Sequence, residues 1–196
     1  MLVTVVRRDV GEHFLFDARE ICVNSEAVRA QWLAEEAAIR ARLGAPGVVT
    51  LEQLRAVPGL EFFERMGRGE FPWAPIGQTL DFIPVEWKKG RVVFQGTPRK
   101  AYYNPIGSVH GGYAATLLDS CLGCAVHSTL PEQTGYTTVE LKVNYIRPLT
   151  EDTGPVRAEG KVVSVGRQVG IAEGRIHDAS GKLYAFATTT CLIFPI

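Results

Sequence analysis

NPIGSVHGGYAATLLDSCLGCAV, residues 104–126, is the stretch of sequence that decides the fold. If the second half of this stretch is helical, apolar side chains lie on almost every side of the helix. This apolar pattern extends from Val109 to Leu130, and Pro131 ends it. A helix that is apolar nearly all round is normally buried on most sides. The sequence therefore predicts a long helix at the centre of the fold, with the rest of the chain packed around it.

Strand-like segments stand on both sides of this helix. Two short ones precede it, at residues 80–87 and 92–97, with a hairpin turn predicted at Lys89-Gly90. Three candidates follow it: residues 136–147, residues 154–177 running on through Gly166, and residues 183–194 after a turn at 178–181. This order predicts an α+β fold in which an antiparallel sheet wraps a single helix. Within 136–147 the residues that alternate, and that should share one buried face, are Val139, Leu141, Val143 and Tyr145.

Residues 1–75 have a different, helical pattern. Over residues 25–43 one helical face collects Val28, Trp32, Ile39 and Leu43, and glycine and proline follow as stop signals. The segment 50–53 (TLEQ) has the form of a capping box that opens a second short helix, and residues 60–66 predict a third. We therefore divide the chain into a helical N-terminal extension, 1–75, and a sheet-and-helix domain, 76–196.

Composition limits the class of protein. The chain has 196 residues, with 21 Lys and Arg against 21 Asp and Glu, so its charge indicates no nucleic-acid partner. The start reaches Arg7 and Arg8 after a short apolar run, and no window approaches the roughly 18 apolar residues of a membrane span. Four cysteines among 46% hydrophobic residues do not suggest a disulfide framework. We expect a soluble, cytoplasmic protein with reduced thiols and no membrane partner.

Two features of the sequence could carry chemistry. Asp119 stands in the middle of the apolar helix, where an ionisable group is costly to bury unless it is paired or used. A carboxylate that only caps backbone groups is the alternative. Just before the helix, the glycines of residues 106–112 let the backbone approach a ligand, and unpaired N–H groups at the helix start could stabilise an oxyanion. Alone, the same motif could be a tight loop that enters a helix.

Metal, redox and serine chemistry have little support. Cys121 and Cys124 have Cys-x-x-Cys spacing but lie in mid-helix without a second ligand pair, whereas structural zinc needs four ligands. His13, His127 and His177 lack partners at metal-ligand spacing, and the sequence has no Gly-x-Ser-x-Gly elbow. We expect no metal and no cofactor.

The quoted stretch, followed by YTTVELKVNYIRPL at residues 136–149, resembles acyl-CoA thioesterases of the phenylacetic-acid-degradation (PaaI-like) type in the hotdog superfamily. The shared pattern is an asparagine, His-Gly-Gly six residues later, an aspartate nine residues after that histidine, and a Thr-Val-Glu-Leu-x-Val-x-Tyr strand that ends in Arg-Pro. It covers about residues 76–196. The resemblance implies a hotdog fold and hydrolysis of an acyl-CoA thioester, with aryl and medium-chain acyl groups both open.

The resemblance also implies roles for individual residues. Asp119 matches the carboxylate that attacks the thioester carbonyl or activates a water for the attack, and both roles stay open. Gly111 matches the backbone N–H donor that polarises the carbonyl oxygen, and Asn104 matches an asparagine that helps hold the thioester or the water. His110 matches a residue that orders the loop.

A further residue implied by the resemblance is Thr138, because relatives have a serine or threonine there that assists the carboxylate or the water. Its position in the strand conflicts with this role, since Thr138 alternates with Val139 and Leu141 onto the opposite strand face. The neighbouring Thr137 is therefore an alternative.

Two other functions stay open. The run from Asn104 to Ile106 is similar to part of the Asp-x-x-Asn-Pro-x-His pattern of hotdog hydratases and dehydratases, but Ala101 and Gly107 stand where the aspartate and histidine belong. A non-catalytic acyl-CoA-binding protein would keep the fold without the chemistry. The combined presence of Asn104, Gly111 and Asp119 argues against it.

Helix geometry predicts that two subunits share each active site. Gly111 and Asp119 are eight positions apart, which is about 12 Å along a helix axis at 1.5 Å per residue. One carbonyl must lie about 3 Å from its donor and also near its nucleophile. We therefore expect a homodimer or homotetramer in which each site takes Gly111 and Asn104 from one chain and Asp119 from the other, as the resemblance also implies.

Overall fold

The computed structural model describes residues 18–196, with side chains from residue 25 onward, so His13 and the side chain of Cys22 lie outside the described part. Within it, one antiparallel sheet has the strand order β1-β2-β4-β5-β6-β3. The strands are β1 Phe82–Lys88, β2 Arg91–Gly96, β3 Thr134–Tyr145, β4 Val156–Val165, β5 Val169–Asp178 and β6 Leu183–Pro195.

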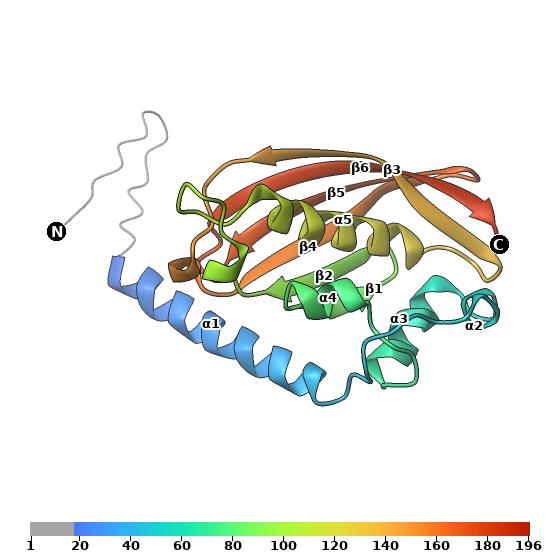
Figure 1. The fold of residues 1–196 in the computed structure, drawn as a ribbon, viewed down its shortest axis with the longest axis horizontal. Helices are drawn as coiled ribbons and strands as arrows, with labels where there is room; N and C mark the ends of the chain where they lie inside the picture. Colours follow the sequence, from blue (N-terminus) through green and yellow to red (C-terminus); the bar gives the residue numbers. More distant parts are fainter. Residues whose placement is uncertain (1–17) are drawn as a thin grey trace, which may run out of the picture.

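Helix α5, Gly111–His127, lies inside the curve of this sheet and contacts all six strands (Figure 1). Leu117, Leu118 and Leu122 are completely buried against the sheet. The predicted α+β arrangement, a sheet wrapped around one helix, is confirmed. The helix is shorter at both ends than the predicted 109–130, because His110 caps its start and Ser128 caps its end.

Glycines on the inner face of the sheet let the helix come close. Gly160 of β4 and Gly174 of β5 stand directly opposite each other in the ladder. A Cβ atom on Gly160 would lie 2.3 Å from the carbonyl oxygen of Cys121, and one on Gly174 would lie 3.0 Å from the Leu122 side chain. The backbone of α5 therefore rests on a part of the sheet that has no side chains.

The predicted strand over residues 154–177 is wrong, because the structure divides it into β4 and β5. These strands pair with each other, and the Gly166 N–H donates to the Val169 carbonyl at 2.8 Å to close a hairpin turn. One continuous strand of that length would run far past the helix, whereas the turn brings the second half back over it. Gly166 was the turn signal in the sequence.

A β-bulge in β3 changes which residues face the helix. The register between β3 and β6 shifts between Thr138 and Glu140, so Val139 loses its place in the alternation. Val139 is 60% exposed, and its predicted burial is wrong. The extra residue leaves Thr138 on the same side as Leu141 and Val143, both half-buried. The predicted burial of Tyr145, at the end of the strand, is also wrong, because this side chain is 57% exposed.

Four helices precede β1 in the described part of the chain: α1 Ala18–Arg40, α2 Leu51–Arg55 and α3 Gly59–Gly67 in the extension, and α4 Pro75–Thr79 across the predicted boundary. The first three were predicted, and the capping box at Thr50 and Gln53 is present. The short α4 was not predicted, and the domain boundary at 75/76 stays a prediction. Over residues 18–196 no helix combines the length and the apolar character needed to cross a membrane.

Helix α1 covers the outer face of the sheet at β1 and β2 (Figure 1). Ile39 packs there in a small second core with Ile83, Val85 and Val93. Alternate residues of the same strands, such as Phe82 and Phe94, face α5 instead. Because successive side chains of a strand point to opposite faces, β1 and β2 contribute residues to two cores, one on each side of the sheet.

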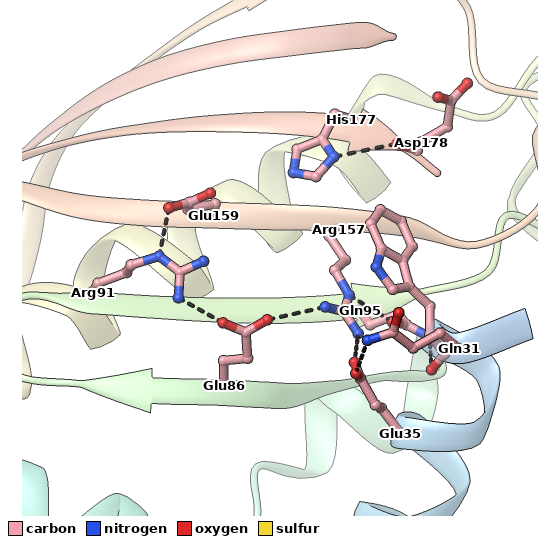
Figure 2. Close-up of polar contacts among 10 residues, drawn as sticks. Gln31, Glu35, Glu86, Arg91, Gln95, Arg157, Glu159, His177 and Asp178 are labelled. Carbon is pink, nitrogen blue, oxygen red and sulfur yellow. Dashed lines mark hydrogen bonds and ion pairs between the residues drawn. The ribbon is translucent and has the colours of Figure 1, made fainter. Parts of the chain in front are cut away.

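A buried arginine adds polar contacts to this attachment. The side chain of Arg157, from β4, is 7% exposed and lies between Glu86 of β1 and Glu35 of α1, as Figure 2 shows. It donates to Glu35 at 2.5 Å, to Gln95 at 2.9 Å and to Glu86 at 3.0 Å. Its guanidinium also stacks 4.5 Å from the centre of the Trp32 ring. These contacts give the buried charge the partners that it requires.

The other end of the extension packs on the end of α5. The Gly59 N–H donates to the Leu130 carbonyl at 3.0 Å, and a Cβ atom on Gly59 would lie 1.8 Å from the His127 carbonyl oxygen. The His127 ring lies among Phe62, Phe63 and Tyr136. Burial lowers the pKa of His127 from 6.5 to about 4, so the ring is neutral at pH 7. His127 is therefore part of the core.

We expect the substitution Gly160→Ala to destabilise the protein because its methyl group would collide with the α5 backbone. The free energy of unfolding, measured by urea denaturation, should fall by about 3 kcal/mol or more. Gly166→Ala is the matched control, since the nearest atom to its Cβ lies at 3.6 Å. Its effect should stay within about 0.5 kcal/mol. Equal losses in the two variants would contradict the close-approach argument.

Candidate active site

Asp119 lies on the one side of α5 that the sheet leaves accessible. The half-buried or exposed residues of this helix follow a single stripe, which consists of Gly111, Gly112, Ala115, Thr116, Asp119, Ser120 and Cys124. The neighbouring Leu118 and Cys121 point into the sheet and are fully buried. The carboxylate is therefore sheltered but reachable, as a group that meets a substrate must be.

Thr138 is the hydrogen-bond donor to this carboxylate. Its hydroxyl donates to Asp119 Oδ1 at 2.9 Å, across from β3 to α5. Thr137, the alternative, is exposed on the other face of the strand. The bulge after Thr138 is what turns this side chain toward the helix while keeping Leu141 inward. The fully buried Cys191, its ladder partner on β6, lies behind the pair.

The loop before α5 is held together by Asn104. Its side-chain oxygen accepts from the N–H groups of Ile106 at 3.1 Å and Ser108 at 3.4 Å, and its amide nitrogen donates to the Ser108 hydroxyl at 3.1 Å. Its backbone N–H also donates to the Ser108 carbonyl at 2.8 Å. In this structure Asn104 therefore orders the glycine-rich loop, and through the loop it positions the start of α5.

The start of α5 presents a free backbone donor. The His110 ring accepts from the Gly112 N–H at 2.9 Å and so caps the helix. The Gly111 N–H bonds to no acceptor within residues 18–196. Tyr145, at the end of β3, lies over Gly111 and donates its hydroxyl to the Gly111 carbonyl at 3.2 Å. A Cβ atom at position 111 would lie 3.1 Å from the tyrosine ring, so a larger residue there would have to displace Tyr145.

A cavity of about 380 Å³ opens beside this donor. Its walls come from the start of α5 and from the segment after β3, and they include His110, Gly111, Tyr145, Arg147 and Tyr184. Tyr145 and Tyr184 were not among the predicted site residues, although Tyr145 closes the Val-x-Tyr strand pattern at residues 143–145. Asp119 does not line this cavity.

Within one chain the candidate residues form two separate groups. Asp119 and Thr138 meet in the middle of α5, whereas Asn104, His110 and Gly111 meet at its start. Because α5 runs unbroken from Gly111 to His127, the eight positions between Gly111 and Asp119 still correspond to about 12 Å. Residues 18–196 contain no group of three or more His, Cys, Asp or Glu side chains arranged to hold a metal ion.

Comparison with known proteins identifies the class. The profile of the Thioesterase superfamily matches residues 106–185. A Halobacterium salinarum protein, provisionally described as an esterase, is 46% identical over 69 residues, which are 34% of this chain and less than half, 44%, of that protein.

Comparison with solved structures gives matches over a larger part of the chain. A Ralstonia eutropha structure, provisionally described as a thioesterase related to phenylacetic acid degradation, is 30% identical with a TM-score of 0.61, and the match covers 67% of this chain and 98% of that one. A Streptococcus mutans protein crystallised with acetyl-CoA is 25% identical with a TM-score of 0.53, and the match covers 58% of this chain and 89% of that one.

These likenesses and the sheet wrapped around α5 identify a thioester hydrolase of the hotdog class. The chain belongs to the Thioesterase superfamily.

We expect Thr138→Val to lower thioester hydrolysis because it removes the donor to Asp119 but keeps the shape of the side chain. A hydrogen bond to a charged group contributes about 1.5–3 kcal/mol, so kcat/KM should fall about tenfold or more. Thr137→Val makes the same change on the exposed face and should leave kcat/KM unaltered. A larger loss in Thr137→Val than in Thr138→Val would exclude the assignment of Thr138.

Proposed function

We propose that this protein hydrolyses an acyl-CoA thioester to the carboxylic acid and free coenzyme A, with water as the second substrate and without a metal or redox cofactor. The observation that carries the proposal is the pairing of Asp119 with the Thr138 hydroxyl on the accessible stripe of α5. A carboxylate fixed in this way can act on a carbonyl that reaches the stripe. The acetyl-CoA found in the Streptococcus mutans relative supports a coenzyme A thioester as the substrate.

In the proposed reaction, Asp119 attacks the thioester carbonyl or draws a proton from the attacking water. The free Gly111 N–H donates to the carbonyl oxygen as negative charge develops on it. His110 and Asn104 keep that donor in place through the helix cap and the loop. If Asp119 attacks, the C–S bond breaks, the acyl group is held on Asp119 as a mixed anhydride, and water then hydrolyses the anhydride. If Asp119 activates water instead, the water oxygen bonds to the carbonyl carbon and the C–S bond breaks. In either case the coenzyme A thiolate takes up the proton released by the water, and the acyl group leaves as the carboxylic acid. Both aryl and medium-chain acyl groups fit this chemistry.

We further propose that the working unit is at least a homodimer. Asp119 and Gly111 of one chain cannot both touch one carbonyl, because the unbroken helix separates them. Antiparallel pairing of two α5 helices about a two-fold axis would bring Gly111 and Asn104 of one chain to Asp119 of the other. The accessible stripe of α5 is the surface that such pairing would use.

Asp119→Asn should abolish turnover and leave the fold intact, because an amide keeps the shape and hydrogen bonding of the carboxylate but is a poor base and nucleophile. Release of free thiol from acyl-CoA should fall at least roughly a hundredfold. Asp152→Asn, the same change at an exposed position, is the control and should keep full activity. Near-normal turnover in Asp119→Asn would refute the mechanism. Binding of acyl-CoA without turnover in the unsubstituted protein would favour the non-catalytic alternative.

Mixing two inactive variants tests the shared site. Asn104→Ala and Asp119→Asn proteins, incubated under conditions that exchange subunits, should form heterodimers with one site that carries both defects and one that carries neither. Activity should then return to about a quarter of the unsubstituted level if exchange is random and the sites are independent. Formation of the heterodimers is verified by mass spectrometry. If these heterodimers stay as inactive as the two parent proteins, the shared site is refuted.

A further inference from the structure

The N-terminal extension and the domain enclose an apolar cavity of about 290 Å³. Its walls come from residues 47–49, from α3 and α4, from β1 and β2, and from one residue of α5, Cys124. The residues that line it include Val49, Phe62, Trp73, Ala74 and Phe94, and none of those that line it is charged. A cavity of this composition favours an uncharged, apolar occupant.

The extension holds the outer wall of this cavity firmly. The Gly47 N–H donates to the Trp73 carbonyl at 2.9 Å, and the Trp73 indole N–H donates to the Gly44 carbonyl at 3.0 Å. Pro46 and Trp73 also form a β-bridge. At the rim, Val48 is 85% exposed and so adds an apolar side chain to the surface at the mouth. The two hydrogen bonds and the bridge thus hold residues 44–47 against Trp73.

The cavity begins where the accessible stripe of α5 ends. Cys124 follows Asp119 by five positions, about 7.5 Å along the helix axis, and Ser120 lies between them one turn before Cys124. All three are half-buried. Burial raises the pKa of the Cys124 thiol to about 12, so this wall carries no charge at neutral pH. Cys124 thus places an uncharged wall of the cavity about 7.5 Å along the helix axis from Asp119.

We propose that this cavity binds the acyl group of the thioester whose carbonyl lies at Asp119, so that the N-terminal extension selects the substrate. The proposal rests on the proposed thioesterase function. It assigns the substrate class as uncharged aryl or medium-chain acyl groups, because a cavity of about 150 Å³ already holds a benzene ring. An acetyl group would leave the cavity empty, and an acyl group with a terminal carboxylate would bury an unpaired charge in it.

The test narrows the cavity and measures the acyl preference. Ala74 is exposed at the rim, so Ala74→Trp adds bulk there with little cost to the core. Hydrolysis of acetyl-CoA, octanoyl-CoA, phenylacetyl-CoA and glutaryl-CoA is compared by thiol release. The unsubstituted protein should prefer octanoyl-CoA or phenylacetyl-CoA over the other two by at least about tenfold in kcat/KM. In Ala74→Trp this preference should fall by at least about tenfold while acetyl-CoA hydrolysis is unchanged.

Ile76→Trp is the matched control, because Ile76 is exposed on α4, two residues after Ala74, but does not line the cavity. It should keep the original preference. If Ala74→Trp does not fold, as judged by thermal unfolding, Val49→Phe adds bulk at another residue that lines the same cavity.

The outcomes separate this proposal from the function on which it rests. An unsubstituted protein that hydrolyses thioesters but prefers acetyl-CoA or glutaryl-CoA would overturn the acyl assignment alone. Equal effects of Ala74→Trp and Ile76→Trp on the acyl preference would also overturn the acyl assignment. No thiol release from any coenzyme A thioester would instead overturn the proposed function.

Discussion

The close contact between the backbone of α5 and the glycine pair Gly160 and Gly174 is the constraint on which the rest of the structure depends. With no side chains on that part of β4 and β5, the sheet can curl around the helix and fill the space on either side with large apolar residues. The contact also fixes the rotation of α5, because Cys121 and Leu122 must face the glycines. Asp119 therefore lies on the side of α5 that the sheet does not cover. A single steric requirement thus determines which residues of the helix can meet a substrate.

The fold was largely predictable from the sequence because its main signals are local. An apolar helix, alternating strands and turn-forming residues each leave a pattern within about twenty positions. Two features escaped this kind of reasoning. The sequence predicts a strand through Gly166, because a single glycine inside a strand pattern can mark a bulge as well as a turn. The bulge at Val139 depends on how β3 pairs with β6, and nothing in β3 alone reveals that register.

Candidate site residues could also be singled out from the sequence, and their roles stay predictions. Asp119 and the glycine-rich loop stood out because a charge in an apolar helix and a helix start without side chains are unusual in any sequence. The choice between Thr137 and Thr138 required the bulge, which only the folded sheet shows. The apolar cavity was not foreseeable, because its walls join segments that are far apart in the chain, such as Val49, Phe94 and Cys124.

The attachment of α1 through Arg157 has a consequence for the way the chain is made. Glu35 and Arg157 are separated by 122 positions. At about 5–20 residues per second, a ribosome needs roughly 6 to 25 seconds to deliver the arginine after it has delivered the glutamate. Late in that interval β1 and β2 are already made and can cover Ile39, but Glu35 and Trp32 still lack the guanidinium that ties them to β4. The attachment of α1 is thus completed only when β4 has been made, and until then the Trp32 end of the helix is open to chaperones.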